Sequence, residues 1–371
     1  MRSLLRSVVA ESRAAGLSRA ELGLDGYYAV SVAVLGGYAT EGVAGVAGDV
    51  AQGLVETLVV LGVDDATETY VRGCMSSRLG YAVKDIAHSV LTCCMSATNA
   101  SALLGKCDMW VFSASQMARL LAAAEANAAA RPHGSLPALA HRPIRKQALG
   151  WDHLATLPRP AFDDDAAGGP SAAAGFHAGT LLDVGAGTGS VTEQLAPFVD
   201  TVVATETAIV NVWCLRSRGF AAVTSGVLEE AGLAEALVSA GAAAPRRGEP
   251  LHFDVVSCFN VLDRCDTPQT LLDDMVALVE PESGRLILSI VLPYHPSVEV
   301  GSRWERPSQF VQAPLGDDAP FEAWVVWFTA TFLHPAGLRV LSWSRVPYIS
   351  PGNTRHAFFV LYNALFVCER I

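Results

Sequence analysis

A short glycine-rich segment constrains the fold of this chain more than any other feature. Residues 181–189 read Leu-Leu-Asp-Val-Gly-Ala-Gly-Thr-Gly, an apolar run that reaches an acid and then a turn, and a helical pattern follows over Ser190–Leu195. Glycine lets the backbone turn sharply and approach a ligand closely, and the first turn of a helix presents free N–H groups. The dinucleotide-binding fingerprint requires glycine where this chain has Ser190, and it does not require the acid Asp183. We therefore expect a strand, a ligand-binding turn and a helix, with Asp183 suited to a ligand that carries a cation.

A second signal follows at the spacing that a nucleotide site requires. Thr201–Thr205 reads as a buried strand that ends on Glu206, and an acid at this place, about twenty residues after the glycines, accepts hydrogen bonds from ribose hydroxyls. Taken alone, Glu206 also fits a solvated strand end or the cap of a helix that begins near Thr207. Combined with the glycine turn, it resembles the first motifs of the S-adenosylmethionine-dependent methyltransferases. The residues predicted to contact this cofactor are Asp183, Gly185, Ala186, Gly187, Glu206 and Asn260.

The acidic composition argues against nucleic acid as the main partner. The chain has 371 residues, a formal net charge of -11 and a pI near 5.3, whereas phosphate binding requires a basic surface. An acidic surface suits a basic or histidine-rich partner instead. None of the eight cysteines belongs to a C-x-x-C pair, and most lie among apolar residues. We therefore expect buried reduced thiols, no metal site and an intracellular protein.

The N-terminal segment leaves the compartment open. Arginines recur at Arg2, Arg6, Arg13 and Arg19, which fits either a weak transit sequence or an amphipathic helix. A cytoplasmic protein and one associated with endomembranes or mitochondria are both compatible with this pattern. The apolar stretch Tyr27–Tyr38 is interrupted by glycine and is too short to span a bilayer, so no integral membrane segment is predicted.

Composition and periodicity divide the chain into three parts. Residues 1–130 are expected to form a helical N-terminal element, with helices over Lys84–Met95 and Ser115–Ala126 and a cap at Ser113 or Ser115. Residues 131–178 are rich in proline, glycine and alanine, which predicts a flexible insertion. Residues 179–371 alternate between strands and helices, as expected for an S-adenosylmethionine-dependent methyltransferase domain.

This alternation predicts an α/β fold with a doubly wound sheet covered on both faces. The expected class is the class I methyltransferase Rossmann-like fold, with seven strands of which the last is antiparallel. A helix is expected over Phe321–Leu333. The predicted strands are Thr180–Val184, Thr201–Thr205, Ala221–Thr224, Phe253–Phe259, Arg285–Val291, Leu338–Ser344 and one near Phe358–Cys368.

A third group of polar residues follows the strand Phe253–Phe259. This strand delivers Asn260 and Asp263 to the edge where the carboxyl ends of the strands meet, together with Gly185 and Glu206. Asn260 is suited to orient a substrate nitrogen, and Asp263 to accept a proton or hold an N–H donor. Ordinary turn chemistry is the alternative, because Asn and Asp at strand ends often bond their own backbone.

Several long motifs resemble the DREV, or methyltransferase-like protein 9, family. The resemblance covers most of the chain from about Tyr70, and its motifs are far more specific than the glycine turn. They are Phe259–Asp266, Leu286–Pro296, Trp304–Ser308 and Arg345–Tyr348, with Leu103–Lys106 and Met109–Ser113 upstream.

The resemblance implies that the protein methylates histidine. Members of the family transfer a methyl group to the pros (N1) nitrogen of histidine in His-x-His motifs with a small x, so histidine-containing proteins or peptides are the expected partners. Neutral imidazole is a competent nucleophile near neutral pH. Asp263 would hold the N–H of the far ring nitrogen, fix the tautomer and stabilise the imidazolium product, while Asn260 positions the ring.

Further residues are predicted to line the site. Lys106 is a candidate for the cofactor carboxylate, and four residues beyond the later strands are substrate candidates, namely Tyr294, His295, Arg345 and Tyr348. Near the C-terminus the family has a Gly-Asp turn and a pair of Asp residues, where this chain has Gly352-Asn353 and Tyr362-Asn363. Two other functions stay open: a methyltransferase of this fold that acts on a small molecule or another side chain, and a non-catalytic binding protein.

Overall fold

The computed structural model describes residues 22–76, 78–130, 175–243, 248–300, 303–353 and 356–371. The arginines of the predicted transit sequence, and residues 131–174 of the predicted insertion, lie outside the described residues.

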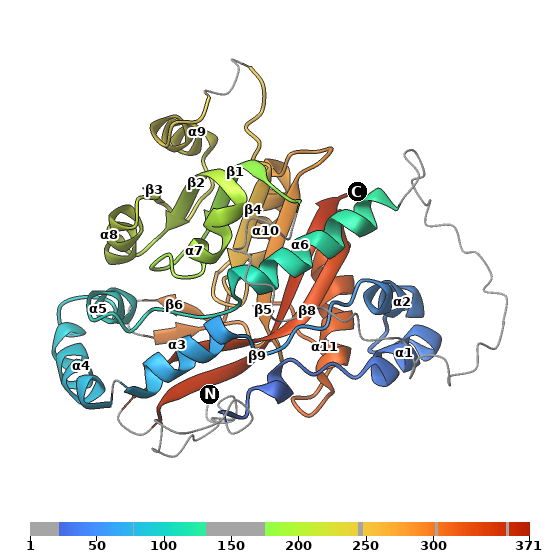
Figure 1. Ribbon diagram of the computed structural model, residues 1–371, viewed down its shortest axis with the longest axis horizontal. Helices are drawn as coiled ribbons and strands as arrows, with labels where there is room; N and C mark the ends of the chain where they lie inside the picture. Colours follow the sequence, from blue (N-terminus) through green and yellow to red (C-terminus); the bar gives the residue numbers. More distant parts are fainter. Residues whose placement is uncertain (1–21, 77, 131–174, 244–247, 301–302, 354–355) are drawn as a thin grey trace.

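One mixed sheet organises the described part of the chain, with seven strands in the order β3-β2-β1-β4-β5-β9-β8 (Figure 1). β1 pairs in parallel with β2 and β4, and β9 runs antiparallel between β5 and β8. The predicted doubly wound sheet with an antiparallel last strand is therefore confirmed. The strands are β1 (Ala178–Val184), β2 (Val199–Glu206), β3 (Ala221–Thr224), β4 (Val255–Phe259), β5 (Arg285–Val291), β8 (Leu338–Pro351) and β9 (Phe358–Arg370).

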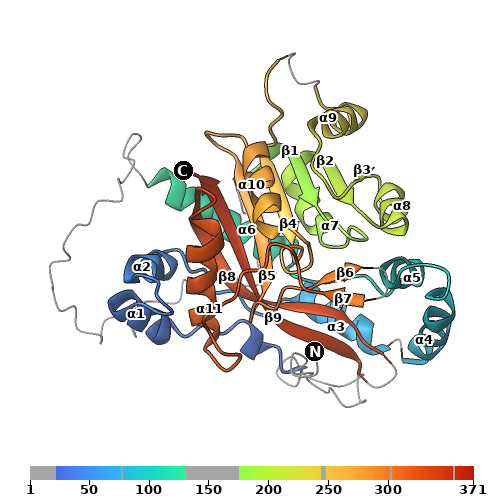
Figure 2. The ribbon, with the colours of Figure 1, turned by 180° about the vertical axis from the view of Figure 1, so that it is seen from behind.

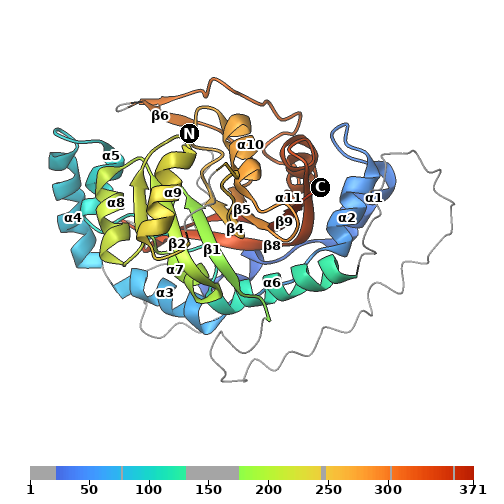
Figure 3. The same ribbon diagram turned by 90° about the horizontal axis from the view of Figure 1, so that it is seen from above.

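Helices cover both faces of the sheet, and Figure 3 shows α6 on one side with α10 and α11 on the other. α11 (Phe321–Phe328) is buried along its length and continues into a π-helical turn, Thr329–Leu333, within the helix predicted here; Figure 2 shows it in front of the sheet. The remaining elements that follow β1 are α7 (Thr192–Leu195), α8 (Ile209–Ser217), α9 (Glu230–Ser239), α10 (Pro268–Leu278) and the short hairpin β6 (Val298–Val300) and β7 (Arg303–Glu305).

The N-terminal residues form helices, as predicted. Ser113 accepts a hydrogen bond from the backbone of Gln116, whose side chain bonds back to Ser113, and this capping box begins α6. The predicted helix over Lys84–Met95 corresponds to α4, which begins earlier and ends at Leu91. The helices are α1 (Val32–Glu41), α2 (Gly48–Glu56), α3 (Asp65–Ser76), α4 (Arg78–Leu91), α5 (Ala97–Leu103) and α6 (Ala114–Ala129).

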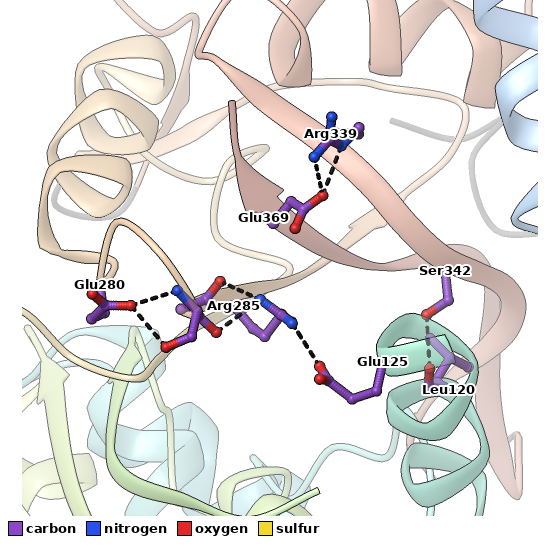
Figure 4. A network of polar contacts seen from close by, with 9 residues as sticks. Leu120, Glu125, Glu280, Arg285, Arg339, Ser342 and Glu369 are labelled. Atoms are coloured by element: carbon purple, nitrogen blue, oxygen red, sulfur yellow. Dashed lines mark hydrogen bonds and ion pairs between the residues drawn. The ribbon is translucent and has the colours of Figure 1, made fainter. Parts of the chain in front are cut away.

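Polar contacts fix α6 to the sheet (Figure 4). The buried guanidinium of Arg285 on β5 donates to Glu125 Oε1 at 2.9 Å, and Ser342 Oγ on β8 donates to the carbonyl of Leu120 at 2.9 Å. α3, α6 and one face of the sheet also contribute side chains to a single apolar cluster. The N-terminal helices therefore share a core with the sheet, which holds the segment before α6 in a fixed position.

β8 is longer than predicted, because it continues past Ser344 through Pro347 to Pro351. Proline lacks an N–H and so argues against an interior strand. β8 is the last strand of the sheet and pairs with β9, where Pro347 lies opposite Tyr362. On its other side β8 forms single bridges from Trp343 to Leu58 and from Ile349 to Trp110, and Pro347 lies between these bridges, where an edge strand tolerates proline. The extended β8–β9 hairpin carries Tyr348 and Asn363 alongside β5.

Candidate active site

The glycine turn is held against the end of β2 and against the segment after β4. The backbone N–H groups of Gly185 and Ala186 donate to the carbonyl of Thr205 at 2.9 and 3.1 Å. Gly185 has a φ of 70°, and a Cβ at this position would lie 2.5 Å from Val261 Cγ2. Beside Gly187, by contrast, a Cβ would meet no atom within 4 Å. The turn therefore requires glycine at Gly185 for close packing and leaves open space at Gly187.

Asp183 lies at the end of β1 and is engaged within the protein. Its carboxylate is 1% exposed and accepts hydrogen bonds from Thr192 Oγ1 at 2.5 Å and Ser257 Oγ at 2.7 Å. Burial raises the pKa of Asp183 to about 6, and the two hydroxyls oppose this rise. The carboxylate thus links β1, α7 and β4 beneath the turn, and it acts on a ligand through the position of the turn.

Glu206 lies beside the same turn and also caps α8. One carboxylate oxygen accepts from the N–H groups of Thr207 and Ala208 at 2.7 and 3.0 Å, and the other accepts from Gly187 N at 2.9 Å. The capping and the nucleotide-site interpretations are therefore compatible, because the oxygen that faces Gly187 has acceptor capacity beyond this single hydrogen bond.

Asn260 and Asp263 follow β4 and carry polar atoms without partners. Asn260 has a φ of 57°, a conformation that non-glycine residues adopt mainly at turns and functional sites. Among the described residues, neither polar atom of its side chain has a hydrogen-bond partner, nor does Asp263 Oδ1. Asp263 is 3% exposed, its Oδ2 lies 3.2 Å from Arg264 Nε, and burial raises its pKa to about 6 against the opposing charge of Arg264.

The segment before α6 lies across the glycine turn, a contact that sequence patterns did not predict. Thr188 Oγ1 donates to Asp108 Oδ1 at 2.8 Å, and Ser190 Oγ donates to the carbonyl of Met109 at 3.0 Å. Lys106, a predicted cofactor ligand, instead forms an ion pair with Asp85 at 2.6 Å. The N-terminal element therefore closes the site through Asp108 and Met109.

α5 bridges the site at the carboxyl ends of the strands. Asn99 Oδ1 accepts from the N–H of Val210 at 3.1 Å, in the first turn of α8, and Thr98 Oγ1 donates to Glu299 Oε2 on β6 at 2.8 Å. The N-cap residue of α8, Ala208, makes no side-chain cap. Asn99 therefore bonds the N–H of Val210 from another element, while Glu206 bonds the N–H groups just before it. Figure 1 shows α5 next to α8 and β6.

Two of the predicted substrate residues follow β5 and differ in exposure. The Tyr294 ring is 4% exposed and packs against Trp327 and Phe332, while its hydroxyl donates to the carbonyl of Leu262 at 3.2 Å. Tyr294 therefore belongs to the core beneath α11 and supports the segment that carries Asp263. The side chain of His295 is partly exposed, and its Nε2 lies 3.2 Å from Asp317.

The two predicted substrate residues on β8, Arg345 and Tyr348, also differ in their surroundings. The guanidinium of Arg345 lies over the rings of Phe321 and Tyr362, at 4.5 and 4.2 Å, and donates to the carbonyl of Ala29 at 2.7 Å. Arg345 is thus held by the N-terminal segment and α11. Burial and then the charge of Asp263 raise the pKa of Tyr348, which lies within β8 opposite Leu361.

Within the described ranges, no cluster of three or more His, Cys, Asp or Glu side chains is arranged to bind a metal ion. Across the same ranges, no helix combines the length and apolar character that crossing a membrane demands.

The strand order with an antiparallel β9, together with the glycine turn, the acid after β2 and the polar residues after β4, defines a class I methyltransferase fold. The chain belongs to the DREV methyltransferase family, whose model matches residues 165–370.

Three solved structures are similar to this chain over about half of its length. A DhpI–SAH complex is 16% identical, with a TM-score of 0.30, over 52% of this chain and 76% of that chain. Magnesium protoporphyrin IX methyltransferase (ChlM) from Synechocystis PCC 6803 with bound SAM is 13% identical, with a TM-score of 0.28, over 51% and 70%. The [4+2]-cyclase SpnF is 16% identical, with a TM-score of 0.32, over 53% and 77%.

Proposed function

We propose that this protein is an S-adenosylmethionine-dependent methyltransferase that methylates the pros nitrogen of histidine in His-x-His motifs of protein substrates. The observation that carries the proposal is the pair Asn260 and Asp263, whose buried polar atoms lack partners at the edge that also holds the glycine turn. Buried polar groups are nearly always hydrogen-bonded, so such atoms at this edge are suited to a ligand. Membership of the DREV methyltransferase family supports methyl transfer.

The residues at the turn fit S-adenosylmethionine, which supplies the methyl group when bound. Open space lies beside Gly187, where a Cβ would meet no atom within 4 Å. Glu206 faces this space with an oxygen that accepts one hydrogen bond from Gly187 N, and so it is suited to ribose hydroxyls. Gly185, Ala186 and Asn260 complete the set that we assign to the cofactor.

Asp263 is the residue we assign to the reacting imidazole. Neutral imidazole carries one N–H and one lone pair, and Asp263 Oδ1 is free to accept that N–H, which leaves the lone pair of the pros nitrogen for the methyl group. As the ring becomes positively charged, the buried carboxylate stabilises it in surroundings where charge interactions are strong. Burial raises the pKa of Asp263 to about 6, which is still below neutral pH, so the carboxylate is mostly ionised there.

Asn260 and the N-terminal element prepare the geometry of the site. The positive φ of Asn260 turns its amide out of the line of β4, and the amide can both donate to and accept from a substrate. Asp108 and Met109 hold the segment before α6 across the glycine turn, which limits the access of water. Fixed orientation of the reactants is a large part of the rate enhancement that such a site provides.

The proposal is tested by incubating the protein with labelled S-adenosylmethionine and two peptides, Ala-His-Ala-His-Ala and the same peptide with both histidines replaced by alanine. We expect label in the first peptide alone. Calorimetry of cofactor binding is the control: binding without transfer to the first peptide favours a small-molecule or other side-chain substrate, and absence of binding favours a non-catalytic protein.

A further inference from the structure

Asn363 is a buried residue whose amide has no partner. It lies within β9, is 0% exposed, and neither its Oδ1 nor its Nδ2 forms a hydrogen bond within the described part of the chain. An unpaired donor or acceptor in the interior destabilises a fold, and an apolar side chain would remove that cost. The amide therefore requires a partner that the described residues do not supply.

The register of the sheet brings Asn363 next to the candidate active site. Asn363 lies opposite Val291, the last residue of β5, and Leu365 lies opposite Ser289. Opposed residues and alternate residues share a face of a sheet, so Asn363 and Ser289 point to the same side. Ser289 is also 0% exposed with an unpartnered Oγ.

Asn260 joins the same group through the backbone. Its N–H donates to the carbonyl of Ser289 at 3.0 Å, and Phe259, which lies opposite Ser289 on β4, packs against Phe112 from the segment before α6. The side chains of Asn260, Ser289 and Asn363 thus gather unpartnered polar atoms at the ends of β4 and β5.

The side chain of the neighbouring Tyr362 points away from this polar group. Its ring stacks on Tyr27 with centroids 4.8 Å apart and lies beneath the guanidinium of Arg345. Of the two residues that replace the acidic pair of the family, Asn363 alone therefore belongs to this polar group. With asparagine in place of the family's acid at this position, none of Asn260, Ser289 and Asn363 carries a charge, and Asp263 supplies the negative charge of the site.

We propose that Asn363 contacts the substrate and selects an uncharged target side chain, with Ser289 beside it. This inference rests on the proposed function, and it adds the specificity of the same site. An amide offers a donor and an acceptor without charge, which matches neutral imidazole.

Two substitutions of Asn363 test this role. Asn363→Leu keeps the branching at Cγ and removes both polar atoms, so we expect peptide binding to weaken about five- to tenfold, with cofactor affinity retained and the melting temperature unchanged or raised. Asn363→Asp adds a buried carboxylate near Asp263, and like charges raise the pKa of both groups. We expect its pH profile of kcat/KM to move upward by about one pH unit.

A pair of serine variants separates substrate contact from structure. Ser289 and Ser342 are both 0% exposed strand residues, but Ser342 Oγ has a partner in Leu120 whereas Ser289 Oγ has none. Ser289→Ala is expected to weaken peptide binding without loss of thermal stability. Ser342→Ala is expected to lower the melting temperature and leave peptide binding unchanged.

The main readout is binding of a fluorescent Ala-His-Ala-His-Ala peptide in the presence of S-adenosylhomocysteine, followed by anisotropy, because it does not depend on turnover. If the wild type binds the peptide without methylating it, the proposed function fails and the Asn363 variants still report on binding. Unchanged peptide affinity in Asn363→Leu, equal losses of peptide and cofactor affinity, or no peptide binding by the wild type would each overturn the inference.

Discussion

Replacement of Asp263 by asparagine is predicted to stabilise the protein while it abolishes most of the activity. Asp263 is 3% exposed, and burial raises its pKa from 3.8 to about 6. Each pKa unit corresponds to about 1.4 kcal/mol, so keeping this carboxylate ionised in the folded protein costs roughly 3 kcal/mol. That net cost already includes the favourable charge of Arg264, and asparagine replaces it with the smaller cost of a buried amide, about 1 kcal/mol.

The raised pKa of Asp263 makes the predicted gain in stability depend on pH. Between about pH 4 and pH 6 the folded protein binds more protons at Asp263 than the unfolded chain does, so stability falls as the pH rises through this window. The cost is fully present above about pH 6 and absent below about pH 4. Asp263→Asn is therefore expected to be about 2 kcal/mol more stable than the wild type at about pH 7.5 and to match it at about pH 4.

Urea unfolding at these two pH values measures the stability, and methyl transfer to the His-x-His peptide measures the activity. Turnover is expected to fall about a hundredfold or more, because the variant can no longer stabilise the charged ring. Asp266→Asn is the matched control, since Asp266 is exposed and bonds Ser308, and its turnover should stay near that of the wild type. A less stable Asp263→Asn at about pH 7.5, or near-normal turnover with cofactor bound, would refute the reasoning.

Three further predictions concern the turn, the pH profile and α5. Gly185→Ala should lower stability by more than about 2 kcal/mol, because its Cβ would lie 2.5 Å from Val261. Gly187→Ala has open space but a φ of 57°, so it should cost about 1–2 kcal/mol in backbone strain and also weaken cofactor binding, as calorimetry would measure. The kcat/KM for the peptide should fall as the pH drops through about 6, where Asp263 gains a proton, and a flat profile would argue against its role. Asn99→Ala should cost about 1 kcal/mol in urea unfolding, because α8 loses its cap, and an unchanged midpoint would contradict this.

Local sequence patterns predicted the central strands well. Arg285–Val291 begins and ends as predicted, because a strand buried on both faces reads as a continuous apolar segment. The bounds of the edge strand Ala221–Thr224 were also predicted correctly. The helix cap, which the sequence predicted at Ser113 or Ser115 and the structure places at Ser113, was likewise predictable, because a cap depends only on residues within one helical turn. These features depend on interactions between residues that are close together in the sequence.

Features that depend on long-range pairing could not be predicted in the same way. The contact of Asp108 with Thr188 joins residues 80 positions apart, and no local pattern specifies it. Tyr294 and Tyr348 both follow predicted strands, yet Tyr294 packs beneath α11 whereas Tyr348 lies within the extended strand β8. The direction of a side chain near a strand end follows from register, which only the assembled sheet defines.

The nitrogen that receives the methyl group is the most direct test of the account. Wild-type protein would be incubated with S-adenosylmethionine and Ala-His-Ala-His-Ala, and the product would be compared by mass spectrometry and NMR with peptides that carry pros- or tele-methylhistidine. The account predicts methylation at the pros nitrogen, because Asp263 holds the proton on the far nitrogen. Methylation at the tele nitrogen, or none despite bound cofactor and peptide, would contradict it.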